Sequence, residues 1–148
     1  MKSYLKTTAG FVLSATMATA SFGATVNVGE LQGFTGPLES MIGPMSGGAN
    51  LAVTEANASG NYLNGTINVV QGDSVCIDPA VAIAQAEKMV NDDNVMAIMG
   101  PNCSGNTGAV ITNVLVPNGI VSISPSATSP ALTTLEDGGW FFRTAPSD

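Results

Sequence analysis

Short apolar runs alternate along the chain with longer segments of helical periodicity. Alternating or continuous apolar residues predict strands at Thr25–Leu31, Thr66–Val70, Val95–Met99, Ile120–Ile123 and Trp140–Arg143. A period of three to four residues predicts helices over Leu38–Ala58, from Asp78-Pro79 to about Asn91, and over Thr107–Val116. Asp78-Pro79 is a strong helix start, because aspartate can cap free N–H groups and proline fits the first helical position.

Alternation of strand and helix at this spacing is typical of parallel βαβ units with right-handed crossovers. We therefore expect the α/β class, as a three-layer, Rossmann-like lobe with a mainly parallel central sheet. In such sheets ligands bind beyond the carboxyl ends of the strands. This rule selects three loops as candidate binding segments, Gly33–Pro37, Gly100–Gly105 and Ser124–Pro130.

The first residues have the pattern of a secretory signal peptide. Lys2 and Lys6 precede a short, weakly apolar stretch, Ala9–Ala20, which ends in an Ala-Thr-Ala cleavage pattern. A membrane-spanning helix needs about 20 strongly apolar residues, and this stretch is shorter and contains Thr and Ser. We expect a signal peptide over residues 1–24, cleaved after Ala20 or near Gly23-Ala24, and a binding lobe over residues 25–148. The expected destination is a Gram-negative periplasm.

Charge and composition narrow the possible functions. The 148 residues include four Lys or Arg, 11 Asp or Glu and no His, for a net charge of −7. Loss of both N-terminal lysines would lower the net charge by two more, to −9. Nucleic-acid binding needs clustered basic residues, and general-base catalysis and metal binding most often use histidine. We therefore expect an acidic, secreted binding protein with no catalytic residues, no cofactor, no metal and no nucleic-acid partner.

Cys76 and Cys103 are the two cysteines of the chain. Export to an oxidising compartment favours a disulfide over two free thiols. In the chain-entropy model a closed loop of this size contributes roughly 3–4 kcal/mol to stability.

Two loops after predicted strands carry polar groups suited to a ligand. Gly100–Thr107 nearly matches the phosphate-loop pattern G-x-x-x-x-G-K-[ST], but Asn106 occupies the position at which the pattern requires lysine. What remains is a glycine-rich turn that feeds a helix, where free N–H groups and the Ser104 hydroxyl could bind a carboxylate. The alternative is that Ser104 only caps its own helix. Ser124–Pro130 is rich in hydroxyl groups, and its alternative is an ordinary polar turn.

Several short motifs, in order, resemble one protein family. They are Thr35-Gly36-Pro37, Gly72-Asp73 with Cys76 and Asp78, Asn102-Cys103-Ser104-Gly105, Ser124-Pro125-Ser126-Ala127-Thr128 and Phe142-Arg143-Thr144. Together they resemble the N-terminal lobe of type I periplasmic binding proteins of the branched-chain amino-acid (leucine, isoleucine and valine) branch. The resemblance implies a solute-binding component of an ABC importer, with a membrane permease as its partner. It also implies a two-lobed, monomeric protein of which this chain is one lobe, the second lobe being missing. A ligand-sensing domain of a receptor or regulator with the same fold is the alternative.

The resemblance also implies roles for individual residues. Ser104 would bind the α-carboxylate of an amino acid, while Thr128 and the Ser126 carbonyl would meet the carboxylate and the ammonium group. The pocket would be bordered by Asn102, Cys103 and Ala127, and Cys76–Cys103 looks like the family's disulfide. Met41 lies about where the family often has an aromatic residue over the ligand. An aliphatic amino acid is expected, and a polar amino acid or a small amide stays open.

Overall fold

Strands and helices alternate as predicted. The computed structural model describes residues 23–61 and 65–148. Its elements are β1 (Thr25–Gln32), α1 (Glu39–Ala58), β2 (Thr66–Asp73), α2 (Pro79–Asn91), β3 (Val95–Met99), α3 (Ser104–Val110), a π-helical turn η1 (Ile111–Leu115), α4 (Val116–Asn118), β4 (Val121–Ser124), a 3₁₀ turn η2 (Pro130–Thr133) and β5 (Phe141–Arg143).

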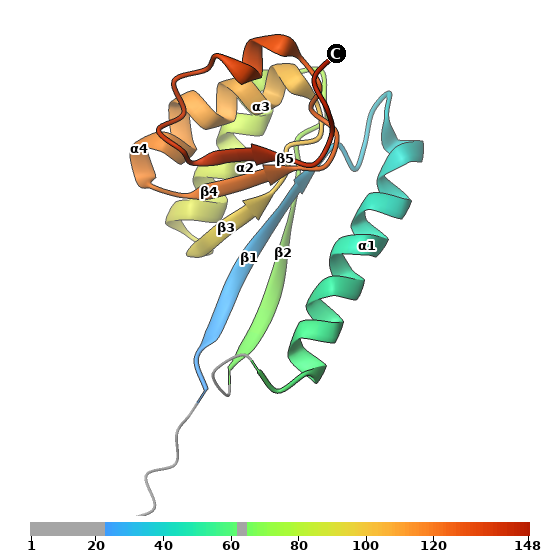
Figure 1. Ribbon diagram of the computed structural model, residues 1–148, viewed down its shortest axis with the longest axis vertical. Helices are drawn as coiled ribbons and strands as arrows, with labels where there is room; N and C mark the ends of the chain where they lie inside the picture. The colour runs from blue at the N-terminus through green and yellow to red at the C-terminus, as the bar shows by residue number, and fades with distance from the viewer. Residues whose placement is uncertain (1–22, 62–64) are drawn as a thin grey trace, which may run out of the picture.

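All strand pairs of the sheet are parallel, in the order β2-β1-β3-β4-β5. The predicted α/β class with a parallel sheet is therefore confirmed. Because the strands are parallel, their carboxyl ends share one edge of the sheet, and the three candidate loops leave from that edge. Strand β1 lies between β2 and β3 in the sheet, so the loops that follow these three strands are neighbours (Figure 1).

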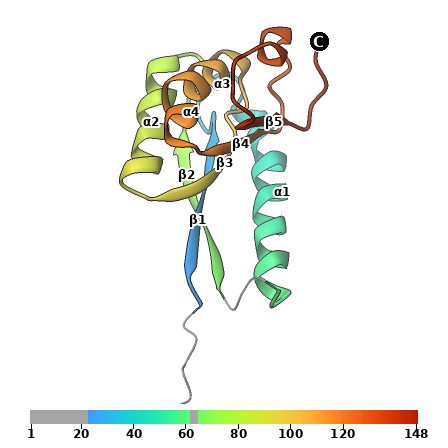
Figure 2. The same cartoon turned by 60° about the vertical axis from the view of Figure 1, so that its left-hand side comes forward.

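One face of the sheet is closely packed. Helix α2 and the continuous helical segment from α3 to α4 cover it, as both views show (Figures 1 and 2). Leu31 from β1 and Ile98 from β3 are at most 2% exposed there and belong to one core with Met89, Ile111 and Leu115. We call this the packed face.

The opposite face carries α1 alone among the described helices (Figure 2). The contacts of α1 with the sheet are mainly with β2, and Ile42 is its buried residue. Its predicted apolar stripe, Ala49, Ala52, Val53 and Ala56, lies half-buried or exposed. The helix is confirmed, but most of its apolar side chains are not in the core.

Some helix and strand boundaries are set by local sequence signals such as capping residues, and others are set by pairing between strands. Asp78 is the N-cap of α2 and accepts from the Ala80 N–H over 2.9 Å, as its sequence signal predicts. The helix after β3 begins at Ser104, three residues before the predicted start. Strand β2 continues to Asp73 because β1 pairs with it along its whole length.

The predicted signal peptide lies almost entirely outside the described residues. Of that segment only Gly23 and Ala24 are described, and both are exposed. Within residues 23–61 and 65–148, no helix has the length and apolar character needed to cross a membrane.

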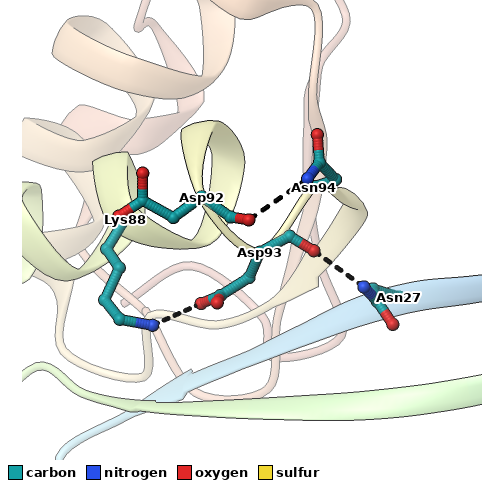
Figure 3. A network of polar contacts seen from close by, with 5 residues as sticks. All are labelled: Asn27, Lys88, Asp92, Asp93 and Asn94. Atoms are coloured by element: carbon teal, nitrogen blue, oxygen red, sulfur yellow. Dashed lines mark hydrogen bonds and ion pairs between the residues drawn. The ribbon is translucent and has the colours of Figure 1, made fainter.

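A polar network closes the amino edge of the sheet, opposite the candidate loops (Figure 3). Lys88 pairs with the Asp93 carboxylate at 2.6 Å, and the Asn27 amide donates to the Asp93 carbonyl over 2.7 Å. Asn94, whose φ is 52°, donates to the Asp92 carbonyl. These bonds hold the turn from α2 to β3 against β1.

Candidate ligand-binding site

The loops after β1, β2 and β3 are tied to one another at the carboxyl edge. The Thr35 hydroxyl donates to the Asp73 carboxylate over 2.6 Å and joins the first two loops. The Gly33 N–H donates to the side-chain oxygen of Asn102 over 2.9 Å and joins the first loop to the third. Asn106 of α3 donates to the Ser74 carbonyl over 2.8 Å. The edge is therefore a connected framework of hydrogen bonds made by side chains.

Burial raises the pKa of the Asp73 carboxyl, but hydrogen bonds outweigh this effect. The Thr35 hydroxyl and the backbone N–H groups of Val75, Thr35 and Phe34 stabilise the charged form and hold the pKa below its ordinary value. Asp73 is consequently a charged anchor for two loops.

Gly100 allows the loop after β3 to pass close to β1. Its φ is +116°, and a Cβ at this position would collide with the Leu31 carbonyl oxygen. Any other residue would be both strained and obstructed. The loop is then held by Ser124 and Thr107, whose hydroxyls donate to the Pro101 carbonyl over 2.6 and 3.0 Å.

Cys76 and Cys103 form a disulfide, as predicted, with their Cα atoms 5.5 Å apart. Cys76 follows β2, and Cys103 is the N-cap residue of α3. The bond fixes the start of α3 to the loop after β2.

Ser104 lies at the start of α3 and connects it to the loop after β4. Its Oγ accepts the backbone N–H groups of Thr128 and Ser129, over 3.1 and 3.2 Å. A hydroxyl oxygen has two lone pairs and one proton. Both lone pairs are used by these bonds, so the proton of the hydroxyl stays available for donation, and no side-chain hydrogen bond caps the start of α3.

The loop after β4 carries two further groups that the sequence predicted to bind the ligand, the Thr128 hydroxyl and the Ser126 carbonyl. Within the described residues, neither the Thr128 hydroxyl nor the Ser126 carbonyl has a hydrogen-bond partner, and both residues are half-buried. The first N–H groups of α3 also have no partner within the helix. The structure thus brings Ser104 and Thr128 together, with donors and an acceptor beside them.

The remaining predicted site residues are largely occupied in holding the framework. Asn102 is 4% exposed and uses its side-chain oxygen on Gly33, while its carbonyl accepts the Ser126 hydroxyl over 2.9 Å. Ala127 is fully buried in the core, and its N–H donates to Ser124 Oγ. Met41 lies in the first turn of α1 and is 53% exposed.

Arg143 has a positioning role that the sequence analysis did not assign. Its guanidinium donates to the carbonyls of Ala127 and Ser129 over 3.2 and 3.0 Å, and to the Thr133 hydroxyl over 2.7 Å. The residue was noted within the motif Phe142-Arg143-Thr144, but the contacts depend on β5 lying beside β4. Arg143 fixes the loop that carries Thr128.

Comparison with known proteins identifies the class. A family model described as periplasmic binding protein matches residues 25–148. The chain therefore belongs to the periplasmic binding protein family, whose type I, branched-chain amino-acid members it resembles in sequence. This is a family of substrate-binding proteins rather than enzymes.

Individual relatives agree with this class. The Leu/Ile/Val-binding protein of Escherichia coli K12 is 34% identical over 105 residues, which are 64% of this chain and 28% of that protein. The leucine-, isoleucine-, valine-, threonine- and alanine-binding protein of Pseudomonas aeruginosa is 32% identical over 128 residues, 82% of this chain and 34% of that protein. A crystal structure of a branched-chain amino acid transporter substrate-binding protein from Streptococcus pneumoniae, in complex with isoleucine, has a TM-score of 0.75 and 32% identity, covering 83% of this chain and 34% of the other. The chain spans about a third of the length of these relatives.

Proposed function

We propose that this chain is the N-terminal lobe of the solute-binding component of an ABC importer that captures an aliphatic amino acid in the periplasm. The observation that carries the proposal is the hydrogen bonding of Ser104. Two loop N–H groups occupy its acceptor sites, so its proton stays available for donation to a ligand.

A zwitterionic ligand needs donors for its carboxylate and acceptors for its ammonium group. The Ser104 hydroxyl and the first N–H groups of α3 supply donors for the carboxylate. The Thr128 hydroxyl and the Ser126 carbonyl supply acceptors a short distance away, since the Thr128 N–H bonds directly to Ser104. The names of the relatives support branched-chain amino acids as the first ligands to test.

A second lobe would complete the site. Ligand binding in a closing cleft uses contacts from both sides and excludes water when the cleft shuts. We expect residues 25–148 alone to bind amino acids far more weakly than a form with both lobes. Delivery to a membrane permease, export by the signal peptide and a monomeric state belong to the same proposal.

Thr128→Val gives the sharpest test, because it removes the unpartnered hydroxyl and keeps the backbone bond to Ser104. In a form with both lobes, loss of one hydrogen bond to a charged ligand group costs about 1.5–3 kcal/mol. Affinity for leucine, isoleucine or valine should therefore fall roughly ten- to a hundredfold by calorimetry. Thr112→Val, on the exposed side of η1, is the matched control and should leave affinity unchanged.

Ser104→Ala is a second variant with a different expectation. It removes the donor to the ligand and also the acceptor for the Thr128 and Ser129 N–H groups, so both affinity and the melting temperature should fall. Unchanged affinity in both Thr128→Val and Ser104→Ala would refute the site.

A ligand that has a carboxylate but no ammonium group, such as benzoate, tests the proposed ammonium site by itself. Equal affinity for benzoate and leucine would show that no ammonium site exists.

A further inference from the structure

Three serines at alternate positions of β4 and the loop after it make the same kind of bond. Each donates its hydroxyl proton to a backbone carbonyl of the loop after β3, over 2.5, 2.6 and 2.9 Å. The donors are Ser122, Ser124 and Ser126, and the acceptors, in the same order, are the consecutive residues Gly100, Pro101 and Asn102. The first two serines are fully buried and the third is half-buried. We call Ser122, Ser124 and Ser126 the serine ladder.

The serine ladder continues the contact between β3 and β4 where their backbone pairing ends. The register of the two strands stops at Met99 opposite Ile123, and the Gly100 N–H donates to the Ile123 carbonyl over 2.9 Å. Beyond this point the carbonyls of the loop after β3 have no strand N–H to accept from. A buried carbonyl without a partner is costly, so the serine hydroxyls take the place of the missing N–H groups.

The bonds of this region leave one backbone carbonyl free. Among the described residues, every carbonyl of 100–103 and of 124–129 accepts a hydrogen bond except that of Ser126. The loop after β3 therefore keeps no free carbonyl near Ser104, which has a hydroxyl proton to donate. The loop after β4 keeps the Ser126 carbonyl and the Thr128 hydroxyl as acceptors.

From these contacts we infer that the serine ladder positions the two halves of the ligand site and separates their polarity. It joins the loop that leads to Ser104 to the loop that carries Thr128, so the two halves keep a fixed spacing before a ligand arrives. It also occupies the carbonyls that would otherwise repel a carboxylate beside Ser104. The serines act through other groups and are positioning residues, and the inference rests on the proposed function.

The first test needs no ligand. The Thr128 and Ser129 N–H groups bond to Ser104 Oγ, so their hydrogen exchange reports whether the two loops keep their spacing. In the 148-residue chain, Ser124→Ala should speed the exchange of both groups roughly three- to tenfold, as expected for one lost hydrogen bond. If Ser124→Ala does not fold, Ser126→Ala, at the half-buried end of the ladder, should give the same increase.

A matched control and one reference position complete the exchange experiment. Ser59→Ala also removes a hydroxyl that donates to a carbonyl, that of Ala56, but at the exposed end of α1, and it should leave both exchange rates unchanged. Unchanged exchange at Thr128 and Ser129 in the ladder variants would overturn the inference. An equal increase at the Leu31 N–H in β1 would also overturn it, because it would reveal only a general loss of stability.

The second test separates affinity from stability in a form with both lobes. Ser126→Ala keeps the Ser126 carbonyl and removes only the bond to Asn102, so leucine affinity by calorimetry should fall roughly three- to tenfold. Ser126→Thr keeps a hydroxyl and should restore the affinity. Ser122→Ala breaks the bond farthest from Thr128, so it should lower the melting temperature more and the affinity less. Equal affinity losses in Ser122→Ala and Ser126→Ala, or no rescue by Ser126→Thr, would overturn the positioning role.

A double-mutant cycle distinguishes positioning from a direct ligand contact. If Ser126 acts by positioning Thr128, the affinity loss of Ser126→Ala should shrink when Thr128→Val is already present. Fully additive losses would make the Ser126 hydroxyl a separate ligand contact and overturn the inference. The proposed function fails separately: Thr128→Val would then leave affinity unchanged, whereas the exchange rates of the first test would still respond to the ladder.

Discussion

The two faces of the sheet differ in how completely helices cover them. On the packed face, Ile98 is 2% exposed beneath α2, whereas Ile123, one strand away and on the opposite face, is 46% exposed. Lys88 and Asp93 pair with each other at the amino edge, whereas Oε1 of the buried Glu30, on the opposite face, has no hydrogen-bond partner among the described residues. The comparison teaches that the described helices close one core on the packed face and leave part of the opposite face exposed.

The largest expected effect comes from the matched pair Ile98→Ala and Ile123→Ala. Truncation in a closed core loses transfer free energy and leaves a cavity, so Ile98→Ala should lower the free energy of unfolding by about 2–5 kcal/mol. Ile123→Ala should cost less than about 1 kcal/mol, since much of its side chain already meets water. Urea unfolding of the 148-residue chain measures both. Similar losses for the two variants would break the distinction between the faces.

Removal of the disulfide tests how the packed face is held at its carboxyl edge. The double variant Cys76→Ser and Cys103→Ser opens a loop of 27 residues, which should cost roughly 3–4 kcal/mol in thermal or urea unfolding. Hydrogen exchange should rise first at the start of α3, where Cys103 is the N-cap. An unchanged midpoint would mean that the bonds from Asn106 and Ser104 suffice to hold this helix.

The smallest expected effect concerns pH and the Asp73 anchor. Because hydrogen bonds hold the pKa of Asp73 below its unfolded value, the stabilisation is fully present above about pH 4. It is lost as the pH falls through the folded-state pKa. As the pH is lowered below about 4 the chain should therefore lose stability, and Asp73→Asn should lose less over the same range. Parallel acid titrations followed by circular dichroism measure the difference. Identical acid slopes would show that Asp73 does not anchor the two loops.

Sequence patterns that span only a few residues were sufficient to predict the order of the main strands and helices. Apolar runs marked every strand, and Asp78-Pro79 marked the start of α2, because capping and proline geometry act within a few residues. The alternation of strand and helix was sufficient for a parallel sheet and for the edge at which a ligand would bind. The pairing of Cys76 with Cys103 followed from their being the two cysteines of a chain expected to be exported.

Contacts between distant residues decided the rest. The Ser104 hydroxyl is not the cap of its own helix, because it accepts the N–H groups of Thr128 and Ser129, 24 and 25 residues away. Arg143 acts on the loop after β4 only because β5 lies beside that strand. The exposure of Ile123 depends on which helices reach the sheet. Hydrophobic periodicity shows that a residue is apolar but does not show what covers it.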